Sequence, residues 1–264
     1  MNLPNQSIQR GARILSLFSY SRPLLKVSHI ARELGLPVGT VHGLVRTLEM
    51  EGFLSQDPRS REYRLGMRLH ELGSIHLATL EINQKAAIPL SYLARETGLV
   101  GRLGVLERAV IVVTLDTLPL SKSSVAPFIG AAAPAYCTSM GRAILAQLPQ
   151  EELHAYLERV KLIKYTPRTV TDRQALLEEI EITRQRGYSL SLQEFLVNLD
   201  SVGAPIFAQG GQVVGGLSLN GEPRLVSEAN LQDLARRVMD TAGEVSRHMG
   251  HYQYLEPSLG RESA

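Results

Sequence analysis

The sequence predicts an α+β protein with a small helical N-terminal domain, a helical connector and a larger C-terminal domain built on a largely antiparallel sheet. Apolar residues recur at helical spacing over most of residues 1–97. From Leu99 onward, short runs rich in β-branched residues indicate strands, and these do not alternate strictly with helices as a parallel sheet requires. We expect domains at residues 1–72 and 98–250, the connector at 73–97 and a flexible tail at 251–264.

Composition sets the outer limits. The chain has 264 residues, 44% of them hydrophobic, which is enough for two modest cores. Its net charge is +2, divided into +4 for residues 1–72 and −2 for the remainder. A basic head on a slightly acidic body fits a DNA-binding module joined to another domain, although a solvated, charge-mixed surface would give the same balance.

The sequence contains no apolar run long enough to span a bilayer, and its first ten residues lack the apolar centre of a signal peptide. A single cysteine, Cys137, cannot form an internal disulfide and excludes a cysteine-based zinc cluster within one chain. We therefore expect a cytoplasmic protein without a membrane partner, a metal or a cofactor.

The first predicted helix covers Ser7–Ser19, with Ser7 as its N-cap. Its apolar stripe consists of Ile8, Ala12, Leu15 and Phe18. A break follows at Arg22-Pro23, and Leu24–Val27 is a candidate short strand. This helix is expected to support the segment that comes next.

Val27–Leu54 has the pattern of one helix, a tight turn and a second helix. Gly35 stands where the first helix should end, because glycine tolerates positive φ, and Pro37 suits the first turn of the second. The core stripe of the second helix consists of Val41, Leu44, Val45 and Leu48. An ordinary helical hairpin fits this pattern as well as a DNA-binding helix-turn-helix does.

The following residues favour DNA binding. Phe53–Gln56 and Glu62–Leu65 are predicted to form two strands around the turn at residues 57–61, which makes a basic wing. The pattern predicts that a dimer binds a palindromic operator on double-stranded DNA, with half-sites roughly 34 Å apart or a multiple of that distance. The predicted base contact is Arg46, helped by Thr40, His42 and Thr47. The predicted phosphate contacts are Arg59, Arg61 and Arg64.

Ser7–Gly73 resembles the winged helix-turn-helix of the IclR family of bacterial transcriptional regulators, on the residues IARELGLPVGTVHGLVRTLEMEGFL and EYRLGMRLHELG. The resemblance continues in PAYCTSMGRAILAQLP, YTPRTVTDRQALLEEIEITRQRGYSL and APIFAQGGQVVGGLSLNG, and so covers nearly the whole chain. It implies a GAF-like or PAS-like effector domain. It also implies a homodimer, or a dimer of dimers, in which the connector helps to pair the subunits.

Two departures from the family pattern bear on function. Gly39 and Gly43 lie on the predicted DNA-facing side of the second helix, where family members often carry serine or basic residues. Glycine there costs helix stability, and either a close approach to DNA or a poorly active reader helix would account for it. The family's usual Pro-Gly-Val loop is replaced by Val197-Asn198-Leu199.

In the C-terminal part, we predict strands at Leu99–Glu107, Val110–Thr117 and Val125–Ile129, and a hairpin formed by Ala204–Phe207 and Val213–Leu219. Helices are predicted from Met140 to Gln147, capped by Thr138 or Ser139, then at Gln150–Leu157 and Asp172–Arg186, with a long terminal helix after Ser227. The helical pattern from Gly66 to Thr97 is expected to break near Gly73 and Pro89.

The predicted effector is a small metabolite that carries a carboxylate and is not chemically changed. Backbone N–H groups of Ser139, Met140 and Gly141 would face an anion at the start of a helix. By resemblance, Ser201, Ser218 and Asn220 match positions at which family members contact effectors. Without the resemblance, Ser218 and Asn220 would suit a polar, exposed strand face.

The alternative is a small-molecule enzyme fused to a DNA module. Cys137 near a helix N-terminus, with His76 or His154 as a base, is its candidate catalytic group, but a lone cysteine is more often a packing residue. His248 and His251 share a helix face without an evident third metal ligand. We therefore predict no catalytic residue and no metal site.

Overall fold

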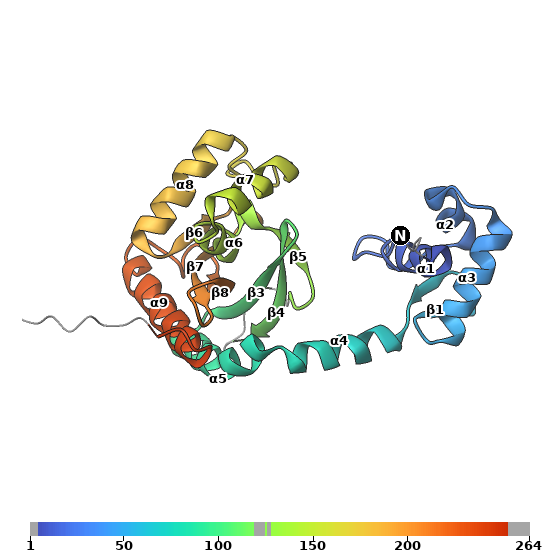
Figure 1. Ribbon diagram of the computed structural model, residues 1–264, viewed down its shortest axis with the longest axis horizontal. Coiled ribbons are helices and arrows are strands. Elements are labelled where there is room, and N and C mark those ends of the chain that lie inside the picture. The colour runs from blue at the N-terminus through green and yellow to red at the C-terminus, as the bar shows by residue number, and fades with distance from the viewer. Residues whose placement is uncertain (1–4, 119–124, 126–127, 253–264) are drawn as a thin grey trace, which may run out of the picture. The chain divides into compact units, whose positions relative to one another are not determined.

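The computed structural model describes residues 5–118, 125 and 128–252 (Figure 1). The chain forms two compact units, Met1–Ala78 and Thr79–Ala264, and the boundary divides the segment 73–97 that we expected to be a separate connector. Of the predicted tail, residues 253–264 lie outside the described part of the chain. Within the described residues, no helix is both long and apolar enough to cross a membrane.

The N-terminal unit consists of three helices followed by a two-stranded hairpin and a fourth helix. Its elements are α1 (Gln6–Leu15), α2 (Val27–Leu34), α3 (Val38–Met50), β1 (Leu54–Gln56), β2 (Tyr63–Leu65) and α4 (Met67–Thr79). The strands are antiparallel, with Leu54 opposite Leu65, and Tyr63 also pairs with Leu25. The core contains Ile14, Leu25, Ile30, Ala31, Val41, Val45, Leu54 and Tyr63. This is the predicted winged helix-turn-helix.

The turn between α2 and α3 forms as the sequence predicts. Gly35 adopts a φ of 64°, and the next residue, Leu36, donates its N–H to the carbonyl oxygen of Ala31 at 3.0 Å. Val41 and Val45 are fully buried, which confirms the predicted core stripe of α3.

The buried face of α1 differs from the prediction. Asn5, not Ser7, caps the helix, and Ile8 is 72% exposed. The buried residues are Gly11 and Ile14, and a Cβ added at Gly11 would lie 3.9 Å from Leu48 Cδ2 of α3, so this face of α1 packs on α3.

The helices after the wing break at a different point from the one predicted. Gly73 lies inside α4 and Pro89 lies inside α5 (Glu81–Thr97), so the interruption falls at Leu80. Pro89 removes one helical hydrogen bond, and burial of the neighbouring Leu90 and Leu93 against the sheet offsets that cost. Of the two helices, α4 has no buried residue, whereas α5 is part of the C-terminal core.

The C-terminal unit is built on a six-stranded antiparallel sheet, which confirms the predicted fold class. Its strands are β3 (Val100–Glu107), β4 (Val110–Thr117), β5 (Ala132–Pro134), β6 (Ser189–Leu192), β7 (Asp200–Phe207) and β8 (Val213–Gly221). Their order across the sheet is β5-β4-β3-β8-β7-β6. Every neighbouring pair is antiparallel.

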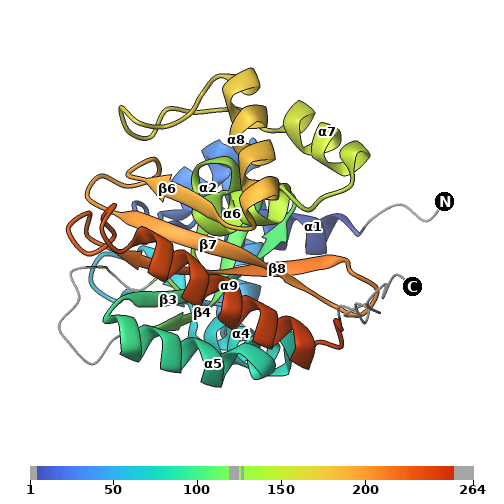
Figure 2. The same cartoon turned by 90° about the vertical axis from the view of Figure 1, so that its left-hand side faces the viewer.

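Helices cover both faces of this sheet. The helices α5 and α9 (Leu231–His248) pack on one face, with Leu90, Leu217 and Val238 in the core between them. On the other face lie η1 (Ala135–Cys137) and α6 (Ser139–Leu145), followed outward by α7 (Gln150–Arg159) and α8 (Arg173–Arg186) (Figure 2). The sheet thus separates two apolar layers.

Two strand predictions are wrong in detail. The third strand is β5, not Val125–Ile129, since Val125, Phe128 and Ile129 lie outside any strand and residues 126–127 lie outside the described chain. The edge strand β6 was not predicted: Ser-Leu-Ser-Leu alternates as a strand does, but it is only four residues long, and its serines, not its leucines, are the buried residues.

Gly141 fixes how closely α6 approaches the chain before it. A Cβ at this position would lie 2.2 Å from the carbonyl oxygen of Ala135. We predict that Gly141→Ala lowers the free energy of unfolding of the C-terminal unit by about 1 to 3 kcal/mol, because the helix must move away. Urea denaturation measures this loss.

Gly73→Ala is the matched control. Nothing lies within 4 Å of a Cβ added at this helical position, so the substitution should be neutral or stabilise the chain. The gain should not exceed about 1 kcal/mol. Equal stability of wild type and Gly141→Ala would contradict the packing described for α6.

Candidate functional site

The outer face of α3 is a polar, exposed surface on the side opposite the core stripe. Thr40, His42, Arg46 and Thr47 are all exposed, as predicted for a surface that meets DNA. The Thr47 hydroxyl donates to the Gly43 carbonyl oxygen at 3.1 Å, within the helix itself. A Cβ added at Gly39 or Gly43 would meet no atom within 4 Å, so neither glycine is required by packing inside the chain.

The wing turn is held by the side chain of Asp57. Its Oδ1 accepts the backbone N–H of Arg59 at 3.0 Å and of Ser60 at 2.7 Å. These bonds, that of Ser60 first, lower the pKa of the Asp57 carboxyl below its usual value. Arg61 adopts a φ of 59°, and Gln56 Nε2 donates to its carbonyl oxygen at 3.0 Å.

The side chains of Arg59, Arg61 and Arg64 are exposed. Arg64 lies on β2 opposite Ser55, and the other two lie in the turn. The wing therefore presents three cations to solvent from one ordered hairpin, which suits contact with a phosphate backbone.

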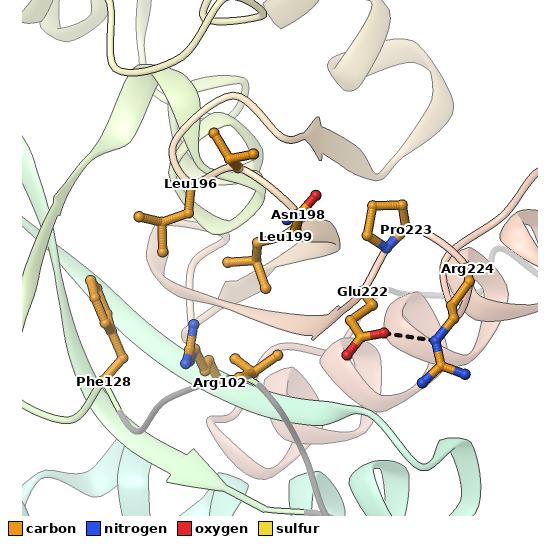
Figure 3. Close-up of a pocket in the computed structure, with 10 residues that line it drawn as sticks. Arg102, Phe128, Leu196, Asn198, Leu199, Glu222, Pro223 and Arg224 are labelled. Carbon is orange, nitrogen blue, oxygen red and sulfur yellow. Dashed lines mark hydrogen bonds and ion pairs between the residues drawn. The ribbon is translucent and has the colours of Figure 1, made fainter.

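A second candidate site is a pair of adjoining cavities inside the C-terminal unit. The outer cavity has a volume of about 650 Å³ and the inner one about 30 Å³. Arg102, Phe128, Leu196 and Leu199 line both. Figure 3 shows Arg102 and the Phe128 ring at one end of the outer cavity and the Glu222–Arg224 pair at the other.

The inner cavity brings together four of the six predicted effector residues, namely Ser139, Met140, Ser201 and Asn220. Gly141 and Ser218 do not line it. The Gly141 N–H donates to Thr138 Oγ1 at 3.3 Å, so Thr138 is the cap of α6. Ser218 is fully buried and its Oγ accepts a hydrogen bond from Asn220 Nδ2 at 2.9 Å. The alternative of an exposed polar strand face is therefore wrong.

Two serine residues that line the inner cavity are buried and have hydroxyl groups that form no hydrogen bond within the described chain. Ser139 is 1% exposed and Ser201 is 6% exposed, and within the described chain neither hydroxyl has a hydrogen-bond partner. Ser191, by contrast, donates to the Cys137 carbonyl oxygen at 2.8 Å. Because a hydroxyl group can both donate and accept a hydrogen bond, Ser139 and Ser201 are suited to bind a small polar molecule in this cavity.

Sequence reasoning missed Arg102, which lines both cavities. It is 4% exposed on β3, with its guanidinium carbon 5.1 Å from the centroid of the Phe128 ring. Its Nε lies 3.6 Å from Asp116 Oδ1. Burial lowers the Arg102 pKa, and Asp116 opposes that shift. The available signal was a single charge in an otherwise apolar strand, LVGRLGVL.

The loop between β6 and β7, residues 193–199, forms part of the wall of both cavities and is anchored by buried polar contacts. Glu194 forms an ion pair with Arg142 of α6, and the Thr169 hydroxyl donates to the Glu194 carbonyl oxygen at 2.6 Å. Arg142 also donates through Nε to the Tyr136 carbonyl oxygen at 3.1 Å. Within the loop, Asn198 has a φ of 62°, a conformation that asparagine tolerates better than most residues.

The candidate catalytic cysteine does not have the properties of a nucleophile. Cys137 is fully buried, and burial raises its pKa to about 12. At neutral pH it is therefore a protonated thiol that packs in the core. The rings of His251 and Phe207 contact each other with their centroids 5.2 Å apart and their planes tilted by 34°. The described residues contain no group of three or more side chains that could hold a metal ion.

Comparison with known proteins agrees with both domains. Residues 7–58 match the IclR helix-turn-helix domain, and residues 75–247 match the C-terminal domain of the bacterial transcriptional regulator IclR. The regulator XynR of Escherichia coli is 32% identical over 93% of this chain and 98% of its own length. The glycerol operon regulatory protein of Streptomyces coelicolor is 34% identical over 93% of this chain and 96% of its own.

A solved structure gives the same result for the fold. A putative transcriptional regulator from Rhodococcus has a TM-score of 0.81 and 29% identity, covering 94% of this chain and 99% of its own. The exposed basic face of the winged helix-turn-helix and these relatives define a DNA-binding transcriptional regulator. The chain belongs to the IclR family of bacterial transcriptional regulators. Its relatives are non-enzymatic, which confirms the prediction that the protein is not an enzyme.

Proposed function

We propose that this protein binds a palindromic operator as a dimer and that a small carboxylate metabolite in the C-terminal cavities controls its affinity for DNA. The observation that carries the proposal is that four residues chosen from the sequence as effector contacts line one buried cavity. They belong to the same chain as an exposed winged helix-turn-helix.

On DNA, we propose that α3 enters the major groove and the wing follows the backbone. Arg46 has the length and charge to donate two hydrogen bonds to a guanine edge, assisted by Thr40, His42 and Thr47. Arg59, Arg61 and Arg64 contact phosphates. The glycines at 39 and 43 leave room for close approach of the helix backbone, which supports this orientation.

Arg46→Ala and Arg61→Ala should then have different effects. Loss of Arg46 should weaken preference at one base position, by about 1 to 3 kcal/mol. Loss of Arg61 should weaken binding to all sequences alike and reduce the salt dependence, because a counterion-releasing phosphate contact is gone. Fluorescence anisotropy with operator variants at several salt concentrations measures both, and a reversed pattern would show that our docking is wrong.

Dimerisation is proposed to involve α4. Met67, Leu72 and Ile75 are 71%, 40% and 61% exposed, and no residue of this helix is buried within the chain. A helix with this much apolar surface is suited to pack against a second subunit. A dimer, or a dimer of dimers, would place two reader helices on successive turns of the operator, roughly 34 Å apart or a multiple of that distance.

We expect Leu72→Glu with Ile75→Glu to shift the protein toward monomers and weaken operator binding by about 100-fold or more, since paired half-site readers lose their mutual effective concentration. Sedimentation and operator titration on the same samples test this. Ser74→Glu, which places the charge at an exposed polar position of α4, is the control and should change neither result. Unchanged assembly in the double variant would exclude α4 from the interface.

For the effector, we propose that a carboxylate metabolite binds reversibly across the two adjoining cavities and that Ser139, Ser201 and Asn220 contact its polar end from the inner cavity. The two unpaired hydroxyls support this, since a bound anion would satisfy them. Met140 contributes an apolar wall. Gly141 and Ser218, which do not line the inner cavity, support the site indirectly: Gly141 permits the close packing of α6, and Ser218 orients Asn220.

Ser201→Ala should weaken binding of the cognate effector by about threefold to tenfold, the usual value of one hydrogen bond to a bound group. Operator binding without effector should remain at the wild-type level, because the substitution lies in the other unit. Calorimetry and operator titration measure the two. If Ser201→Ala and Asn220→Ala together leave effector affinity unchanged, the effector binds elsewhere.

A further inference from the structure

From the two cavities we infer that Arg102 recognises the charge of the effector, and that the effector is a monocarboxylate with an apolar body. This inference rests on the proposed function, because it concerns the same site. The carboxylate would lie at the junction of the cavities, against Arg102, and the body would fill the outer cavity.

The positive charge of Arg102 lies where the two cavities adjoin. Arg102 is 4% exposed and lines both cavities, whereas Ser139 and Ser201 line only the inner one, so Arg102 is a charge that both cavities share. The guanidinium carbon lies 5.1 Å from the centroid of the Phe128 ring, a cation–π contact that places the charge at the cavity wall. A guanidinium group can bind a planar carboxylate through two parallel hydrogen bonds.

Asp116 offsets part of this charge. Its Oδ1 lies 3.6 Å from Arg102 Nε, beyond hydrogen-bond range, while its Oδ2 accepts the Phe128 N–H at 2.6 Å. Asp116 therefore positions both Arg102 and the residue that stacks on it. A ligand carboxylate at hydrogen-bond distance from the guanidinium would interact with it more closely than Oδ1 does.

The two cavities differ in volume and in the polarity of their lining residues. The inner cavity, at about 30 Å³, has room for one small group, comparable to the volume of a single water in the liquid. The outer cavity is about 650 Å³, and six of its ten lining residues are apolar: Val125, Phe128, Leu196, Val197, Leu199 and Pro223. A polar head and a larger apolar body fit this division better than a sugar does.

The end of the outer cavity away from Arg102 is lined by the ion pair between Glu222 and Arg224. Arg224, at the far end of the outer cavity, donates through Nε to Glu222 at 2.7 Å (Figure 3). Glu222 engages Arg224 more closely than Asp116 engages Arg102, at 2.7 Å against 3.6 Å, so a second carboxylate would gain less at that end than at Arg102. The cavity therefore favours one anionic group, at Arg102.

The experiment uses the full-length protein and matched acids and amides. Benzoate and benzamide, and hexanoate and hexanamide, differ in charge but little in shape, and succinate and glycerol represent dianions and neutral polyols. Thermal shift and calorimetry at millimolar concentrations should show binding of at least one monocarboxylate about tenfold or more tighter than its amide. Stabilisation by none of the monocarboxylates, or equal binding of acid and amide, would overturn the inference.

Variants assign the preference to Arg102. In Arg102→Gln with Asp116→Asn, which removes both buried charges together, the ratio of acid to amide affinity should fall to about one while amide binding persists. Arg102→Lys should restore part of the ratio, because lysine keeps the charge without the fork. Arg108→Gln, which changes an arginine whose side chain is 92% exposed and which lines neither cavity, should leave the ratio within about twofold of wild type. A ratio unchanged in the double variant would show that Arg102 is only structural.

Operator binding in the same samples separates this inference from the proposed function. If a neutral ligand, but no acid, changes operator affinity, the protein is effector-controlled and the role of Arg102 is wrong. If acids bind through Arg102 and operator affinity does not change, Arg102 recognises the charge and the proposed control of DNA binding is wrong.

Discussion

The C-terminal unit depends on the buried ion pair between Arg142 and Glu194. Arg142 is 2% exposed and lies on α6, among the apolar residues of one core layer. An arginine buried there without a partner would cost several kcal/mol, so the segment that carries Glu194 is held against the helix. That segment continues into residues 196–199, all of which line the outer cavity, and Leu196 and Leu199 line the inner one as well. The charge in the core thus determines where the cavity wall lies.

On the opposite wall of the cavities, another buried charge, that of Arg102, is likewise held by contacts with its neighbours. Arg102 stands on β3, Asp116 on β4, and Phe128 follows β4 along the chain. Each contacts at least one of the other two, so a change in one should be felt by all three. The ligand we infer would join this network from the open side. Ser139, on α6, connects it to the wall that Arg142 and Glu194 hold.

Local sequence patterns predicted those elements whose position depends on a single feature, such as helical spacing of apolar residues or a glycine at a helix end. Val41 and Val45 repeat at helical spacing, and Gly35 ends α2 through its positive φ, so the helix-turn-helix followed directly. The start of α1 depends on whether Asn5 or Ser7 provides the cap, and both are good caps, so the pattern could not choose. The break expected at Pro89 did not occur because burial of the surrounding residues of α5 outweighed local propensity. Gly73 lies within α4, which has no buried residue, so packing within the chain does not explain why that helix continues.

The candidate site was predicted less completely than the fold. Ser139, Ser201 and Asn220 were identified through a helix start and a family resemblance, and all three line the inner cavity. Arg102 was not, because a charged residue within a strand gives no indication of the face toward which it points or of what surrounds it. The partners Asp116 and Phe128 are separated from it by 14 and 26 positions, and only the folded sheet brings them together.

The central claim is that occupancy of the C-terminal cavities and binding of the operator are energetically coupled. Coupling between two sites is reciprocal, so calorimetry of a carboxylate effector, with and without saturating operator DNA, tests it directly. The account predicts that operator changes the effector's Kd by the same factor by which the effector changes the operator's Kd. An effector Kd that is identical in the presence and absence of operator would contradict it.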